Sequence, residues 1–183
     1  MGFDFDPSEI PENMDGFDFP KLGSYHFQVN KVSEDEKSPA MIVECEILAG
    51  TPAGQEGKTH REYFYPPTAD QDPAKQMATR KRTLQFFVAV GLTTEEELLD
   101  AKKAGKRVSI DEKLAVGRQF CGKLTAGKPN DSGKIYNKLG YDIWAVNSPK
   151  SEGIPLNVAM LEKNGEKPAV GGSAGGDSFG DIF

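Results

Sequence analysis

Few of the residues and motifs on which enzymes and metalloproteins depend occur in this sequence. Its 183 residues include only two cysteines and two histidines, none in the close CxxC or HxxxH spacing of a preorganised zinc site. A zinc ion would have to collect all four of these scattered side chains. A glycine-rich phosphate loop and a GxSxG nucleophile elbow are also absent. We therefore expect no enzymatic activity and no metal or other cofactor.

Long hydrophobic runs are absent as well. No stretch approaches the roughly 20 apolar residues that cross a bilayer, and the first residues are acidic where a signal peptide is basic. The two cysteines, Cys45 and Cys121, are expected to be reduced thiols in a core and not part of a disulfide framework. These features predict a cytoplasmic protein without a membrane partner.

Basic residues are missing from one end of the chain and concentrated in its centre. The first 20 residues carry six acidic side chains and no lysine or arginine. Residues 58–144 hold 16 basic and 11 acidic residues, whereas the rest of the chain holds 6 and 17, and the net charge is −6. A basic centre between acidic ends fits an ordinary solvated surface, and it also fits a nucleic-acid contact confined to the centre.

Three strands and two helices are predicted in the first two thirds of the chain. Apolar and polar residues alternate over residues 23–32 and 40–49, and β-favouring residues fill 58–65 up to a double proline. A helix is predicted from the N-cap Asp72, followed by proline, to residue 90. A second, shorter helix begins at a capping box and ends at a glycine; its signals are Thr94, Glu97 and Gly105.

The chain then returns to strands over residues 118–125 and 134–146, which form a hairpin with a long, basic loop. Residues 154–161 are the one later stretch that fits another short element. Three strands, a helical insertion and two strands is the order of an OB fold, a five-stranded Greek-key barrel. We predict a mainly β protein in three parts: an acidic extension at 1–21, an OB-type domain at 22–161, and a flexible linker with an acidic tip at 162–183.

The last residues carry a family resemblance. Residues 164–176 form a linker rich in glycine and alanine, and residues 177–183 read Asp-Ser-Phe-Gly-Asp-Ile-Phe. A barrel followed by such a linker and an acidic tip with a terminal phenylalanine resembles bacterial and phage single-stranded DNA-binding proteins. The resemblance implies that the tip recruits replication or recombination proteins, although it has few acidic residues and no proline before the phenylalanine. The implied partner-binding residues are Asp177, Phe179, Asp181, Ile182 and Phe183.

The first residues are similar to a second group. The opening Met-Gly-Phe-Asp-Phe-Asp-Pro-Ser, followed by Pro-Lys-Leu-Gly-Ser-Tyr at residues 20–25, looks like the start of an uncharacterised group of phage-encoded proteins. Origin in a phage would place the protein in the cytoplasm of a bacterial host.

A single-strand binder needs aromatic faces for the bases and cations for the phosphates. On the third predicted strand, Arg61, Tyr63 and Tyr65 share one face by parity, while Phe64 points into the barrel. On the fifth, one face holds Tyr136, Lys138 and Trp144, and the core face holds Ile135, Leu139, Tyr141 and Ile143, unless a bulge at Gly140 breaks the alternation.

Further cations surround these two strands. Lys123 projects from the fourth strand, Lys128 and Lys134 flank the hairpin loop, and Arg80, Lys81 and Arg82 fit a solvated helix face or an extended phosphate track. Each aromatic residue has a role in the core as its alternative. The predicted DNA-binding residues are Arg61, Tyr63, Tyr65, Lys123, Lys128, Lys134, Tyr136, Lys138 and Trp144.

Two functions are compatible with these patterns. The first is protection of single-stranded DNA in phage replication or recombination, with partner proteins recruited through the tip. The second is a protein-only adaptor or inhibitor whose acidic ends mimic nucleic acid. The salt dependence of oligonucleotide binding separates them, because only phosphate contacts release counterions. The sequence is compatible with a monomer and with a homo-oligomer.

Overall fold

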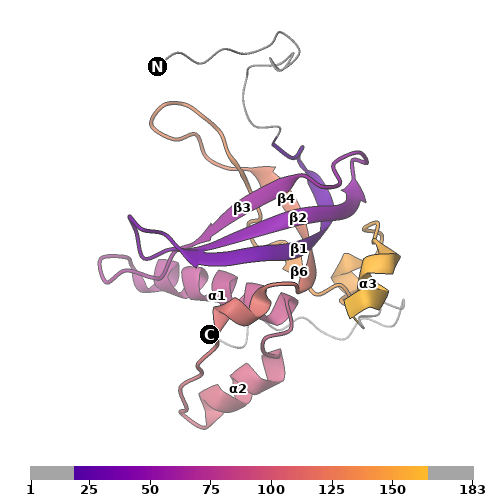
Figure 1. The fold of residues 1–183 in the computed structure, drawn as a ribbon. Helices are drawn as coiled ribbons and strands as arrows, with labels where there is room; N and C mark the ends of the chain where they lie inside the picture. The colour runs from indigo at the N-terminus through magenta and orange to yellow at the C-terminus, as the bar shows by residue number, and fades with distance from the viewer. Residues whose placement is uncertain (1–18, 165–183) are drawn as a thin grey trace, which may run out of the picture.

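The computed structural model describes residues 19–164, and its strands form a curved antiparallel sheet (Figure 1). The strands are β1 (Gly23–Glu34), β2 (Met41–Thr51), β3 (Thr59–Phe64), β4 (Gln119–Ala126), β5 (Asn137–Lys138) and β6 (Ile143–Trp144). Their order is β3-β2-β1-β4-β5, and β6 also pairs with β4. This mainly β arrangement is consistent with the predicted OB-like fold, but the barrel is not closed, because β3 and β5 do not pair.

Alternation along β1 and β2 buries one face of the sheet. Tyr25, Phe27 and Val29 of β1 are fully buried, as are Val43 and Cys45 of β2. The register between the two strands shifts twice, between residues 26 and 27 and between residues 29 and 31. Such irregularities bend a strand, so β1 can pair with β2 on one side and β4 on the other within a curved sheet.

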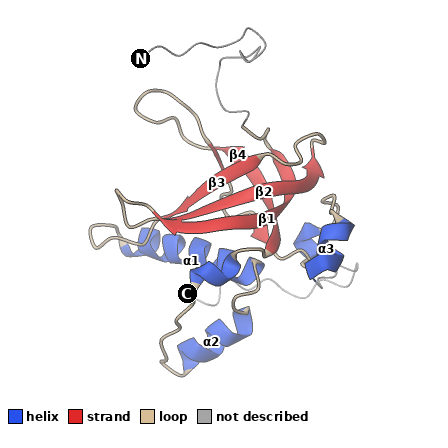
Figure 2. Cartoon of the chain, viewed as in Figure 1, coloured by secondary structure: helices blue, strands red, loops and turns tan. Residues whose placement is uncertain are grey.

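The two predicted helices form the insertion between β3 and β4. Helix α1 (Pro73–Ala89) begins where the Asp72 carboxylate accepts a hydrogen bond from the Lys75 N–H. Helix α2 (Glu95–Lys103) begins at the Thr94 capping box, as predicted. Figure 2 shows α1 along one face of the sheet and α2 farther from it. A third helix, α3 (Val158–Asn164), is the short element expected near the end of the domain.

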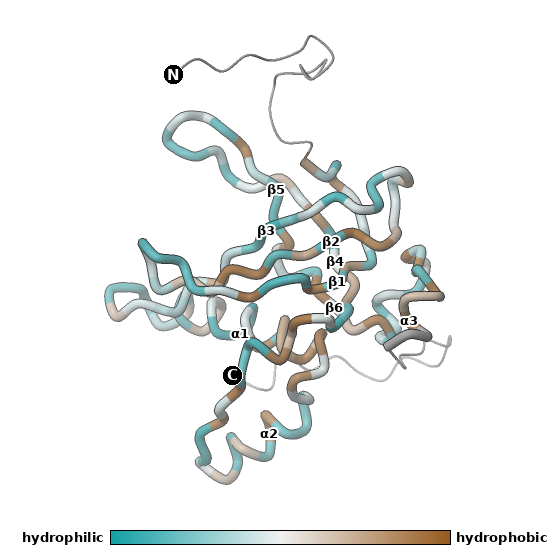
Figure 3. The backbone as a smooth tube through the Cα atoms, viewed as in Figure 1, coloured by the Kyte–Doolittle hydropathy of each residue, from teal (hydrophilic) through white to brown (hydrophobic). Residues whose placement is uncertain are grey.

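The main core lies between the sheet and α1. Phe86 of α1 packs against Phe64 and Phe120, with ring centroids 4.9 Å and 5.8 Å away, and Phe27 stacks on Phe120 at 5.1 Å. Figure 3 shows hydrophobic segments, coloured brown, along the strands of the sheet. A smaller cluster joins Cys121, Val146 and Leu161 between β4 and α3. None of the helices among residues 19–164 is both long enough and apolar enough to span a membrane.

The prediction of one continuous strand over residues 134–146 was wrong. The chain instead forms β5 and β6, each two residues long, on either side of Gly140, whose φ is +26°. This left-handed conformation breaks the alternation of faces. Leu139 and Ile143 are buried as predicted, but Ile135 and Tyr141 are about half exposed, with 54% and 49% of their surface accessible.

A buried histidine attaches the segment before α3 to the sheet. The His26 Nδ1 accepts a hydrogen bond from the Asn157 N–H at 3.1 Å, so the Nε2–H donates to Gln119 Oε1 at 2.9 Å. The Gln119 amide donates in turn to the Met160 carbonyl at 3.1 Å. Burial lowers the pKa of His26 below its ordinary value of 6.5, and the bond to Gln119 offsets only part of that effect.

Acidification is therefore expected to loosen α3. The neutral His26 ring contributes its full stabilisation above about pH 6.5, and this contribution is lost as the pH falls through the lowered pKa of the folded state. The cause is that a proton on Nδ1 would face the Asn157 N–H. Hydrogen exchange at residues 158–161, corrected for intrinsic rates, should accelerate relative to α1 between pH values of about 7.5 and 5. Exchange rates that change by the same factor in α3 and α1 would contradict the expectation.

Candidate nucleic-acid interface

The outer face of β3 carries a pair of stacked tyrosines. Burial alternates along the strand, so His60, Glu62 and Phe64 are buried, whereas the side chains of residues 61, 63 and 65 face outward. Tyr63 and Tyr65 stack with ring centroids 6.3 Å apart and an interplanar angle of 17°. The parity prediction for this strand is thus confirmed, including the inward position of Phe64.

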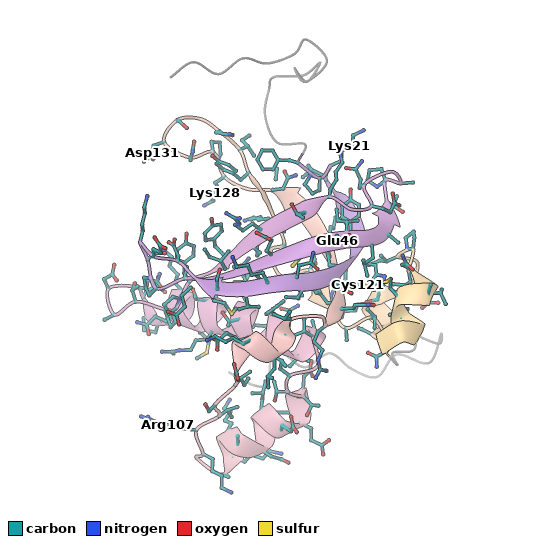
Figure 4. The ribbon with its side chains drawn as sticks, viewed as in Figure 1. Lys21, Glu46, Arg107, Cys121, Lys128 and Asp131 are labelled. Carbon is teal, nitrogen blue, oxygen red and sulfur yellow. The ribbon has the colours of Figure 1, made fainter. Side chains whose placement is uncertain are left out.

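The loop between β4 and β5 forms the opposite wall. Figure 4 shows it arching past β3, with Lys128 near its base and Asp131 near its tip. The loop is closed at its base by the Gly127 N–H, which donates to the Tyr136 carbonyl at 2.7 Å. Nearer the tip, Asn130 Oδ1 accepts from the Lys134 N–H at 2.8 Å. A Cβ at residue 127 would lie 2.6 Å from the Tyr136 carbonyl oxygen, so this close contact requires glycine.

Between these walls lies a cavity of about 900 Å³, which we call the β3–β5 groove. Its lining combines aromatic rings with cations, and Tyr65 and Tyr136 expose 53% and 47% of their surface. The Lys134 ammonium adjoins the groove, 5.2 Å from the centroid of the Tyr136 ring. Six predicted DNA-binding residues line the groove itself: Arg61, Tyr63, Tyr65, Lys128, Tyr136 and Lys138.

A buried ion pair fills the gap where β3 and β5 fail to pair. The Glu62 carboxylate accepts from His60 Nε2 at 2.7 Å, from the Leu139 N–H at 2.8 Å and from Arg82 of α1. Arg82 also donates to the carbonyls of Tyr63, at 3.0 Å, and Gly140, at 3.1 Å. These contacts, which we call the Glu62 seam, connect both walls of the groove to α1.

The ionised state of Glu62 is stabilised by its neighbours. Burial alone raises the pKa of the carboxyl, but the His60 hydrogen bond, the Arg82 charge and the Leu139 N–H together hold that pKa below its ordinary value of 4.5. The negative charge of Glu62 is thus compensated beneath the groove. On the rim, Arg61 donates to Glu44 at 2.9 Å, which leaves Lys128, Lys134 and Lys138 as the cations that give the groove its positive character.

Three side chains lie elsewhere than the sequence predicted. Trp144 is half-buried against the cluster of Cys121, Val146 and Leu161, and does not line the groove. Lys123 is exposed on β4 but is likewise not part of the groove lining. Arg82, expected on a solvated face or phosphate track, points into the Glu62 seam. The predicted partner-binding residues at 177–183 lie outside the described residues.

Phe19 and Ile135 are among the groove residues that were not predicted from the sequence. Phe19 precedes the first strand, and its ring meets that of Tyr136 edge-on at 6.4 Å. Ile135 also lines the groove and is more than half exposed. The inward parity of Glu62 was a usable signal for the seam, because a buried carboxylate requires a cation or several donors. Nothing in the sequence indicated which arginine would supply the charge.

The described residues offer little for metal or thiol chemistry. Across residues 19–164, no three or more His, Cys, Asp or Glu side chains gather in a way that would hold a metal ion. Cys45 and Cys121 are free thiols, both buried, and burial raises the pKa of Cys45. The lysines at the groove are suited to binding anions, and its exposed tyrosines are suited to stacking on flat rings. No known family model matches the chain, and no curated protein matches it either, so the geometry of the groove is the basis for assigning a function.

Proposed function

We propose that the protein binds single-stranded DNA in the β3–β5 groove without catalysing a reaction on it. The observation that carries the proposal is the convergence of exposed aromatic rings and lysines from β3, the β4–β5 loop and β5 on one cavity. In OB folds, the same region of the third strand and the loop before the last strand contributes to oligonucleotide binding. The proposed setting is phage replication or recombination, in line with the resemblance of the two ends.

Bases and phosphates have different partners in the groove. Tyr65 and Tyr136, on opposite walls, present faces on which bases can stack, and Lys128 and Lys138 stand beside them for the phosphates. Each base stack contributes roughly 1–3 kcal/mol. A duplex conceals its base faces, so this arrangement favours a single strand.

The direct test is a titration with a fluorescently labelled thymidine oligonucleotide and with duplex of equal length, followed by anisotropy. Trp144 is a poor reporter because it does not line the groove. We expect tight single-strand binding that weakens with salt, with a slope in log–log form of about −2 to −3 for three or four phosphate contacts. Equal affinity for duplex would overturn the stacking arrangement. Absence of any complex would favour the protein-only adaptor.

Replacement of Tyr65 or Tyr136 by alanine is expected to weaken single-strand binding by roughly 1–3 kcal/mol, which is about 5-fold to 150-fold. Both rings are about half exposed, so their loss should lower the melting temperature little. Tyr141→Ala is the matched control, because this tyrosine is equally exposed but lies outside the groove. Affinity unchanged in both groove variants, or reduced as much in the control, would contradict the proposal.

Recruitment of partner proteins is proposed for residues 177–183. Deletion of this segment should leave the melting temperature essentially unchanged and single-strand affinity equal or slightly higher, because an acidic segment does not bind phosphates. The terminal phenylalanine with its carboxylate is a compact ligand for a basic-rimmed pocket. Pull-down from a bacterial lysate should therefore recover replication or recombination proteins with the full chain only, and identical partner lists would refute this role.

A further inference from the structure

The chain enters the fold along the wall of the groove. Phe19, the first described residue, lines the groove and packs edge-on against Tyr136. The next residues are fixed by two hydrogen bonds: Asn137 Nδ2 donates to the Pro20 carbonyl at 2.5 Å, and the Lys21 N–H donates to Gln55 Oε1 at 3.0 Å. Residues 1–18 are therefore attached to the fold at the groove.

The tethered residues have the chemistry that the groove accepts. Residues 1–18 contain six acidic side chains and no lysine or arginine, whereas the groove is bordered by Lys128, Lys134 and Lys138. The sequence Gly-Phe-Asp-Phe occurs at residues 16–19 and again at residues 2–5. The second copy ends in the groove residue Phe19, and the first repeats the same alternation of ring and carboxylate. Rings and anions are also what a single strand presents to a binding groove.

We propose that residues 1–18 occupy the β3–β5 groove when no DNA is bound and compete with the single strand. The occupant is chosen by charge and by attachment, since this segment starts at the groove wall and carries three times as many acidic side chains as residues 177–183. Equivalent positions of the two Gly-Phe-Asp-Phe copies are 14 residues apart, a span of up to about 46 Å when extended, so the first copy can reach the groove.

The strength of this competition follows from the short tether. A segment tied to the rim has an effective concentration of about 1 mM, so an intrinsic dissociation constant of about 0.1 mM would reduce DNA affinity about tenfold. Weak contacts therefore suffice. Screening should remove most of the effect at high salt, because the attraction is between solvent-exposed charges.

Occupancy can be measured without DNA in the full chain. Both native cysteines are buried, so Ser8→Cys takes a nitroxide label selectively. We expect amides of Lys128, Tyr136 and Lys138 to be broadened by the label. The broadening should fall when Asp4, Asp6, Asp15 and Asp18 are changed together to asparagine, and persist when the same four are changed to glutamate. Equal broadening in all three proteins would overturn the proposal, because the covalent attachment alone would then explain it. No broadening in any of them would also overturn it, because the segment would then not occupy the groove.

Affinity supplies the second measurement, and this part rests on the proposed function. The asparagine variant should bind a thymidine oligonucleotide about tenfold tighter than the full chain at about 20 mM salt and less than about twofold tighter at about 300 mM. The glutamate variant should match the full chain. Unchanged affinity in the asparagine variant would overturn competition, while single-strand binding would stand. If no variant binds DNA, the proposed function fails, and the nitroxide experiment still decides whether the segment occupies the groove.

Discussion

Arg82→Met is expected to lower the free energy of unfolding by about 3–5 kcal/mol, because it leaves the buried Glu62 carboxylate without its compensating charge. The arginine also donates to carbonyls on both sides of the open edge, which would lose these partners. Denaturation in urea, monitored by circular dichroism, measures the change. Arg80→Met is the matched control, since this exposed arginine lies two positions earlier on α1.

The double variant Glu62→Gln, Arg82→Met separates the two causes. Removal of both charges should cost less than the sum of the single changes, because the penalty of a buried unpaired charge disappears. The pKa of Glu62 lies below its ordinary value, so the stabilisation by its ionised form is complete above about pH 4.5 and is lost as the pH falls further through the folded pKa. A destabilisation by Arg82→Met no larger than that of Arg80→Met would show that the seam does not hold the walls together.

Simultaneous replacement of Lys128, Lys134 and Lys138 by glutamine is expected to weaken single-strand binding about 100-fold at about 0.1 M salt. Each phosphate contact to a single strand contributes about 0.7 to the slope of log K against log salt, so three contacts account for about two decades and a slope smaller by about 2. All three side chains are exposed, so the melting temperature should change little. Anisotropy titrations at four or more salt concentrations give both quantities.

The control for this charge change is a second triple variant with the same net effect. Lys102, Lys103 and Lys106 lie at the end of α2 and just after it, and none of them lines the groove. Their replacement by glutamine should alter affinity by less than about threefold, because salt screens most of the attraction between these distant charges and the DNA. Equal losses in the two triple variants would mean that the protein attracts DNA by overall charge and not through the β3–β5 groove.

Local signals predicted the elements that depend on neighbouring residues. The Asp72 cap, the Thr94 capping box and the alternation on β3 are read within a few residues of one another, and the structure has all three. The stacked pair Tyr63 and Tyr65 follows from that alternation, because two residues of the same parity must share a face.

Features that depend on distant pairing escaped prediction. The sequence allowed for a bulge at Gly140, but nothing nearby in the sequence indicated that Trp144 packs against Cys121, Val146 and Leu161. Arg82 points into the protein because Glu62, 20 residues away in sequence, is buried beside it. The contact of His26 with Asn157 spans 131 residues and has no periodic signature in the sequence.

The open edge of β3 also bears on how the protein behaves at high concentration. An unpaired strand edge offers a template on which other chains can add strands and form aggregates. β3 is only six residues long and contains charged side chains, Arg82 donates to the Tyr63 carbonyl, and Pro66 and Pro67 follow after Tyr65. A chain arriving at this edge would find the Tyr63 carbonyl already bonded, and the two prolines could not continue the ladder. The barrel can thus stay open for a ligand without the strand polymerisation that an exposed edge otherwise invites.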